Sequence, residues 1–95
     1  GYEFKGHRYW HKYTNEQIEA LRLLIAHVKR LYPNIDMSAG LPKLLREGVD
    51  PRDAFGFNVD AYYGRIKGFW THTNVRTDKF DCFPQIELVN MLKAL

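Results

Sequence analysis

The feature that most constrains the fold is one helix whose two ends are both marked in the sequence. Residues 14–17 (TNEQ) match a capping box, in which the first and fourth residues exchange hydrogen bonds at the start of a helix. Tyr13 and Ile18 stand where a hydrophobic staple would pack across that start. Apolar residues then recur at helical spacing up to Pro33, which cannot continue a helix. The sequence therefore predicts a helix over residues 15–32, with a buried face formed by Ile18, Leu21, Leu24, Ile25, Val28, Leu31 and Tyr32.

Patterns on either side of this helix predict strands and a second helix. Residues 1–6 (GYEFKG) alternate apolar and polar side chains, which is the period of a half-buried strand. Residues 65–71 (RIKGFWT) are typical of a buried strand that ends at His72. Residues 84–95 predict a terminal helix that buries Ile86, Val89, Leu92 or Met91, and Leu95. We therefore expect a single α/β domain over residues 1–95, with helices flanking a mixed sheet.

The segments between these elements carry weaker patterns. Residues 6–12 (GHRYWHK) are polar and aromatic, as in a loop, and residues 41–47 predict a short helix closed by Gly48. Residues 50–56 are typical of turns, and residues 58–64 of a loop with aromatic side chains. Together they predict a long, partly ordered connection of the kind that often shapes a binding surface.

Composition narrows the class of protein without selecting a function. The 14 Lys and Arg against 11 Asp and Glu give a net charge of +3, which suits an anionic partner such as nucleic acid or a cell-wall polymer. The single cysteine excludes an internal disulfide. No apolar run approaches the roughly 20 residues that span a membrane, and the first ten residues lack the apolar region of a signal peptide. Because the chain begins at a glycine within an expected strand, we expect a processed or truncated product.

Candidate chemistry is concentrated in residues 72–84 (HTNVRTDKFDCFP). His72 and Asp81 could form part of a catalytic zinc site, which usually has three protein ligands and one position open for water. Lys79, between them, could stabilise a developing negative charge. The alternatives are a hydrogen-bonded structural His72 and a solvated Lys79. Cys82 is a rival ligand to Asp81, but in an extended segment it would point to the other side and serve as packing, so we favour Asp81.

Four motifs occur in order along the chain: residues 1–6 (GYEFKG), residues 13–17 (YTNEQ) opening a helix that ends at Tyr32 and Pro33, a strand reaching His72, and residues 79–81 (KFD). Together they resemble the second half of the zinc-dependent N-acetylmuramoyl-L-alanine amidases, the family related to phage endolysins, cell-wall recycling amidases and peptidoglycan-recognition proteins. The order matches over nearly the whole chain, and the long middle segment resembles an insertion. Residues 82–84 (CFP) replace the Pro-Gly that usually follows the last motif, which changes the loop but leaves the ligand spacing intact.

The resemblance implies the C-terminal half of an α/β amidase domain that hydrolyses the amide bond between N-acetylmuramic acid and L-alanine in peptidoglycan. His72 and Asp81 would be Zn²⁺ ligands, Lys79 would stabilise the oxyanion, and Glu3 would be the general base acting on the zinc-bound water. Glu3 could instead be a polar residue on the solvent face of its strand. The family's first zinc ligand lies on an earlier strand, ahead of the segment matched by residues 1–6. We therefore expect an N-terminal segment or a partner chain to complete the sheet and the zinc site, and the protein to act on the bacterial cell wall.

Aromatic and basic side chains gather just before the long helix. Trp10 and His11 are candidates for lining a groove that binds sugars and stem peptides. His7 and His11 lie four apart, as in a metal pair on a helix, but they precede the helix cap and are more typical of a loop; His27 is more typical of a structural histidine. The same cluster could bind nucleic acid by stacking and phosphate contact, but it lacks a recognised motif, so no nucleic-acid or membrane partner is expected. The alternative to an enzyme is a non-catalytic peptidoglycan-binding module of the same fold.

Overall fold

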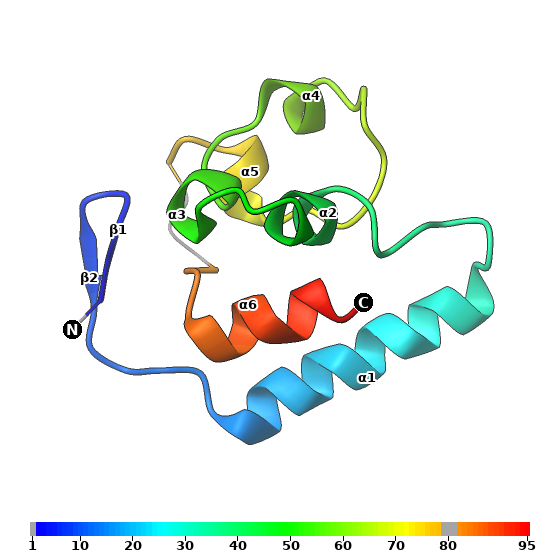
Figure 1. Cartoon of the computed structure of the whole chain (residues 1–95), viewed down its shortest axis with the longest axis horizontal. Helices are drawn as coiled ribbons and strands as arrows, with labels where there is room; N and C mark the ends of the chain where they lie inside the picture. The colour runs from blue at the N-terminus through cyan, green and yellow to red at the C-terminus, as the bar shows by residue number, and fades with distance from the viewer. Residues whose placement is uncertain (1, 79–81) are drawn as a thin grey trace.

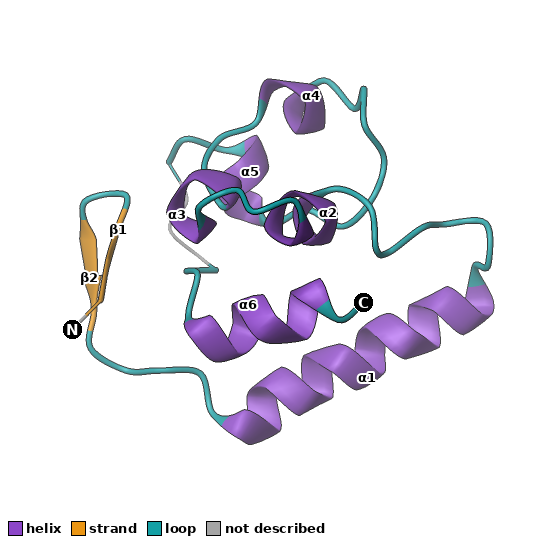
Figure 2. Ribbon diagram, in the orientation of Figure 1, coloured by secondary structure: helices purple, strands orange, loops and turns teal. Residues whose placement is uncertain are grey.

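The computed structural model describes residues 2–78 and 82–95 and shows a small mixed α/β protein (Figures 1 and 2). In chain order its elements are β1 (Tyr2–Phe4), β2 (His7–Tyr9), α1 (Asn15–Leu31), α2 (Leu41–Arg46), α3 (Pro51–Ala54), α4 (Val59–Tyr62), α5 (His72–Val75) and α6 (Ile86–Lys93). Helix α6 runs between α1 and α2, and the two strands form a hairpin at one edge of the molecule (Figure 2). None of the helices in these two ranges is long and apolar enough to cross a bilayer.

The buried core lies where α6 packs on α1 and α2, and it extends past the end of α3 to the hairpin, where Phe4 meets Phe55. It consists mainly of Phe4, Ile25, Leu41, Leu45, Ala54, Phe55, Phe83, Leu88, Val89 and Leu92. The terminal helix is confirmed, and Val89 and Leu92 are buried as predicted. The prediction for Ile86 is wrong, because this first residue of α6 is 61% exposed while the buried stripe runs through Leu88 and its neighbours.

Helix α1 has the predicted start. Thr14 is the N-cap: its hydroxyl accepts from the Gln17 backbone N–H at 3.1 Å, and the Gln17 side chain accepts from the Thr14 backbone N–H at 2.8 Å. The predicted buried face is only partly confirmed, because Ile25 is buried while Leu24, Leu31 and Tyr32 are more than half exposed. Helix α6, with which α1 packs, has 8 residues against 17 in α1, so much of the apolar face of α1 has no cover among the described residues.

The first predicted strand is confirmed as β1. The prediction of a loop over residues 6–12 is wrong in part, because His7–Tyr9 form the strand β2. The strands pair antiparallel, with Phe4 opposite His7, and their turn holds Lys5 and Gly6 at φ of 54° and 74°. Positive φ at both central residues is the geometry of a two-residue hairpin turn, for which the glycine is suited. Within residues 2–78 and 82–95 this hairpin is the whole sheet, so the helices pack mainly on one another rather than on the mixed sheet that we expected.

The predicted strand over residues 65–71 is also wrong. Phe69 makes a single parallel bridge to Gly40, with Leu41 N–H donating to the Phe69 carbonyl at 2.9 Å, and His72 begins α5 instead of ending a strand. The short helix over residues 41–47 is confirmed as α2. The segments expected as turns and loop contain α3 and α4, because Asp50 and Asn58 cap them through side-chain hydrogen bonds.

The close crossing beside that bridge depends on a glycine. Gly68 has a φ of +149°, and a Cβ there would lie 2.5 Å from the backbone carbonyl of Ala39. We expect Gly68→Ala to lower the free energy of unfolding by about 2 kcal/mol, because backbone atoms must move apart and the φ is strained. The matched control is Gly48→Ala, which has a φ of +90° but open space around it and should cost about 1 kcal/mol. If denaturant titrations gave the same loss of unfolding free energy for both variants, the close contact of Gly68 with Ala39 would be contradicted.

Candidate functional site

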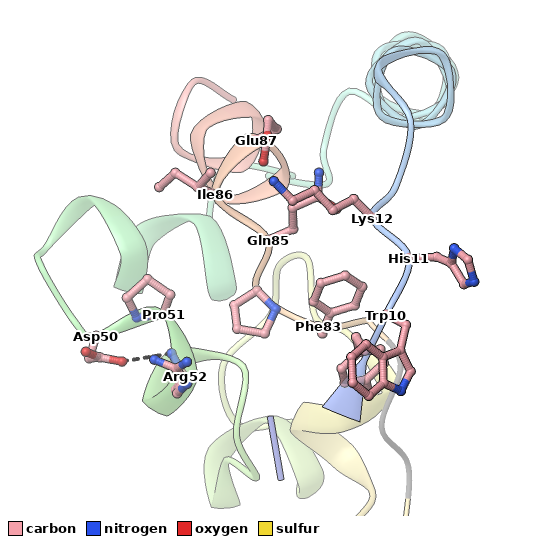
Figure 3. A pocket seen from close by; sticks show the side chains of 12 residues that line it. Trp10, His11, Lys12, Asp50, Pro51, Arg52, Phe83, Gln85, Ile86 and Glu87 are labelled. Atoms are coloured by element: carbon pink, nitrogen blue, oxygen red, sulfur yellow. Dashed lines mark hydrogen bonds between the residues drawn. The ribbon is translucent and has the colours of Figure 1, made fainter. Parts of the chain in front are cut away.

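A groove of about 440 Å³ opens between the segment that links the hairpin to α1, the start of α3 and the start of α6 (Figure 3). Its lining is mostly apolar and includes Trp10, Pro51, Phe83, Pro84 and Ile86. A concave, mainly apolar surface of this size with a few polar groups is the usual form of a small-molecule or peptide site. The groove is therefore the candidate binding surface.

One wall of the groove is a stack of aromatic rings. Phe83 lies between Tyr9 and Tyr13, with ring centroids 4.2 Å and 4.7 Å apart and interplanar angles of 18° and 29°. Gln85, which is 4% exposed, accepts from the Tyr13 backbone N–H at 2.6 Å and donates to the Tyr13 carbonyl at 3.1 Å. The Tyr13 hydroxyl accepts from the Phe83 backbone N–H at 3.2 Å. These contacts fix the segment before α6 against the start of α1, so this wall is rigid.

Charges of both signs lie at the ends of the groove (Figure 3). At one end Asp50 caps α3 by accepting from the Arg52 backbone N–H at 2.9 Å, and the Arg52 side chain donates to the Glu3 carbonyl at 3.1 Å. At the other end stand Lys12 and Glu87. A hydrogen bond from its own backbone N–H, helped by Gln85 and by the charge of Lys12, holds the pKa of Glu87 below its ordinary value. The groove therefore suits a ligand that carries both amine and carboxylate groups.

Trp10 and His11 both line this groove, which is where the sequence placed a substrate surface. Trp10 is 73% exposed, and the Arg8 guanidinium lies 5.4 Å from its ring centroid. His11 is exposed at the outer rim, and its imidazole points away from Pro51 in Figure 3. His7, the other histidine of this segment, lies in β2 with its ring 4.9 Å from that of Tyr9.

The candidate ligand His72 is the first residue of α5, and its side chain is exposed. Its neighbours are buried and bonded: the hydroxyls of Thr71 and Thr73 lie 2.6 Å apart, and Asn74 is fully buried. The Asn74 side chain donates to the Ala54 and Gly56 carbonyls, each at 2.8 Å, and accepts from the Thr71 backbone N–H at 3.0 Å. The buried network thus holds the backbone on both sides of His72 and leaves its imidazole facing solvent.

The candidate base Glu3 lies in β1, and its carboxylate is exposed. It pairs with the Arg8 guanidinium across the hairpin at 2.8 Å. Exposed pairs of this kind contribute at most about 1 kcal/mol, so the carboxylate could exchange Arg8 for another partner. The backbone of Glu3 touches Arg52 of the groove, but the structure gives Glu3 no contact with His72.

Lys79 and Asp81 lie outside the described residues. On the N-terminal side of them, Arg76 forms a two-point ion pair with Asp78, at 2.8 and 3.0 Å, and Lys5 donates to the Arg76 carbonyl. On the C-terminal side, Phe83 joins the groove. The described residues on either side of 79–81 thus belong to the segment after α5 and to the wall of the groove. Among residues 2–78 and 82–95, no three His, Cys, Asp or Glu side chains are grouped as metal ligands.

Cys82, the rival ligand, is half-buried and lines a small hollow between α1 and α6, together with Tyr13, Gln17, Ile18, Leu21 and Leu88. Its surroundings in this hollow are mainly apolar, and its role as packing or as a ligand stays a prediction. Small buried cysteines in such settings behave as hydrophobic side chains.

Several groove residues were missed in the sequence. Pro51 and Arg52 come from a segment expected to be turns, and Gln85 was expected only as part of a helix. The signal for Asp50 and Pro51 was present, because an Asp followed by Pro is typical of a helix N-cap and its first turn. Gln85 had no such signal, since its partner Tyr13 is 72 residues away.

Comparison with protein-family models, with curated proteins and with solved structures gives no match. The functional interpretation therefore depends on the residues of the site and on the motif order along the chain.

Proposed function

We propose that this chain is part of a zinc-dependent N-acetylmuramoyl-L-alanine amidase, which acts on the peptidoglycan of the bacterial cell wall. The observation that carries the proposal is the setting of His72. A solvent-facing imidazole stands on a turn fixed by buried Thr71, Thr73 and Asn74, and Lys79 and Asp81 follow it in the sequence by seven and nine residues. A fixed backbone pre-organises a ligand, which reduces the conformational entropy lost when the ligand binds its partner.

The chemistry assigns a role to each residue. When bound, zinc would supply a Lewis acid and a water with its pKa lowered to about 7. His72 and Asp81 would be ligands. Glu3, released from Arg8, would accept a proton from the attacking water and pass it to the departing amine nitrogen, while Lys79 would neutralise the oxyanion. Water adds to the carbonyl carbon and the C–N bond breaks, which yields a carboxylate on the sugar and a free L-alanine amine.

The groove supports the choice of peptidoglycan. Its apolar floor around Phe83 and Pro84 suits the aliphatic part of a short peptide, and its ends offer Arg52 and Glu87 for carboxylate and amine groups. Stem peptides carry all three kinds of group. Trp10 at the rim offers an exposed ring face on which a sugar could stack.

The exposed apolar residues of α1 are evidence that a further segment belongs to the active enzyme. Leu23, Leu24 and Leu31 are each more than half exposed, and Ile35 beyond the helix is 46% exposed. Several exposed leucines on one helix favour a contact with another chain or segment. We propose that an N-terminal segment or a partner chain covers this face and supplies the remaining zinc ligand.

The proposal is tested by release of stem peptides with a free N-terminal alanine from purified peptidoglycan. The 95-residue chain is compared with the same chain extended by whatever residues its gene encodes before Gly1. We expect zinc-dependent release by the extended protein, abolished by chelator and restored by zinc, and release at least about 100-fold slower by the 95 residues alone. Chelator-resistant release by the 95 residues alone would overturn the proposal.

A second candidate is a peptidoglycan-binding module without turnover. It is favoured by the pairing of Glu3 with Arg8, which occupies the proposed base. Metal content separates the two candidates, because the enzyme must hold one zinc per active site and a binding module need not hold any. If the protein bound peptidoglycan but contained no zinc after incubation with zinc, the binding module would be favoured.

A further inference from the structure

A second surface, away from the groove, is built from exposed aromatic rings. Phe57, Tyr62 and Tyr63 stand on and beside α4, and their exposed fractions are 44%, 54% and 68%. With Val59 and residues 75–77 they border a hollow of about 510 Å³, which we call the aromatic platform. The Phe57 and Tyr62 centroids lie 5.5 Å apart at 55°, and those of Tyr62 and Tyr63 5.0 Å apart at 71°. Because the rings are tilted, they leave much of their faces open.

The platform is fixed to the helix that carries His72. Asn58 caps α4 by accepting from the Ala61 backbone N–H at 3.1 Å, and its own backbone N–H donates to the Asn74 carbonyl at 2.8 Å. Ala61, within α4, is buried. Val75 and Arg76 of the platform follow His72 by three and four residues. Helix α4, which carries the rings, is therefore tied to α5, which begins at His72.

The charges at the platform are paired locally. Arg65 lies 4.8 Å from the Tyr63 ring centroid and 3.6 Å from the Asp60 carboxylate, and Arg76 pairs with Asp78 at 2.8 Å. The two cations are thus balanced by two carboxylates. Proteins that bind single-stranded nucleic acid combine stacking rings with a net positive groove. Lys5, whose ammonium donates to the Arg76 carbonyl at 3.2 Å, adds one positive charge at the border of the platform. One surplus charge is far less than the row of cations that follows a phosphate backbone, which favours a neutral ligand.

We propose that the aromatic platform binds the carbohydrate strand of peptidoglycan. A sugar ring has an apolar C–H face that an aromatic ring can cover, and hydroxyls that can bond with tyrosine hydroxyls and with Thr77 at the border. The choice of a peptidoglycan glycan among neutral sugars rests on the proposed function. The platform would hold the glycan while the groove receives the stem peptide.

The test uses a soluble N-acetylglucosamine oligomer, which has no stem peptide and no scissile amide. Its binding to the 95-residue chain is followed by NMR shifts of the aromatic side chains, and then with Tyr62→Ala/Tyr63→Ala. The matched control is Tyr32→Ala, an exposed tyrosine at the end of α1, which lies across the molecule from α4 (Figure 1). We expect saturable binding that changes little with salt and that weakens about tenfold or more in the double variant but not in the control.

The outcomes separate this inference from the proposed amidase activity. If the protein bound the sugar through the platform but hydrolysed no peptidoglycan, the platform would be supported and only the amidase proposal would be overturned. Hydrolysis without any saturable sugar binding would overturn the platform. The platform would also be overturned if Tyr32→Ala weakened sugar binding as much as the double variant does. Binding of a poly-dT strand alone, weakening with salt, would overturn it as well. So would NMR shifts that depend only on protein concentration, because these would indicate self-association.

Discussion

Replacing Asn74 with alanine should lower the free energy of unfolding by about 4 kcal/mol. The Asn74 side chain is fully buried and joins the Ala54 and Gly56 carbonyls to the Thr71 backbone N–H. Alanine leaves these three buried backbone groups without their partner and opens a cavity. Chemical denaturation followed by circular dichroism measures the loss.

The control for this variant is Asn90→Ala, an exposed asparagine on α6. It should change the free energy of unfolding by less than about 0.5 kcal/mol. Asn74→Asp keeps the shape but replaces the donating amide with an acceptor, so it should be no better than alanine. If Asn74→Ala were as stable as Asn90→Ala, the turn that supports His72 would not be held as described.

Replacing His72 with alanine should weaken metal binding by about 100-fold or more, since even a change in the residues that support a ligand costs 10–100-fold. The exposed position of His72 means that its removal should leave the fold intact. The affinity is measured by titration with Co²⁺, whose visible absorption reports its ligands. Thermal unfolding of the same variant shows whether the fold is kept.

His27→Ala is the matched control, because His27 is also an exposed histidine on a helix and does not line the groove. It should change the Co²⁺ affinity by less than about twofold, within the usual range of a surface substitution. Equal weakening in both variants would show that surface histidines bind the metal without a built site, and His72 would lose its proposed role.

The elements that could be predicted from the sequence are those with local signals. The capping box at Thr14 and the apolar spacing of α1 need only neighbouring residues, and so do the strand β1 and the helix α6. The prediction of a strand over residues 65–71 was wrong because this segment is shaped by contacts with residues distant in the sequence. Its apolar residues pack around a crossing at Gly68, and the Thr71 cap turns the chain into α5. An apolar run alone does not distinguish these outcomes.

The candidate site divides in the same way. Trp10 and His11 were predicted from the aromatic and basic residues around them to line a substrate groove. Both line the groove of the structure, and substrate binding there stays a prediction. The groove itself needs Gln85 to reach Tyr13 and Arg52 to reach the hairpin, contacts across 72 and 49 residues that no local pattern encodes. Lys79 and Asp81 lie outside the described residues, so their roles stay predictions.

The central claim is that one metal ion is bound jointly by His72 and Asp81. X-ray absorption at the zinc edge of the zinc-loaded chain tests it most directly. We predict nitrogen and oxygen ligands at about 2.0–2.2 Å from the zinc. The imidazole signature should disappear in His72→Ala, and the number of oxygen ligands should fall in Asp81→Ala. A sulfur shell at about 2.3 Å, lost on Cys82→Ser, or an unchanged imidazole signature in His72→Ala, would contradict it.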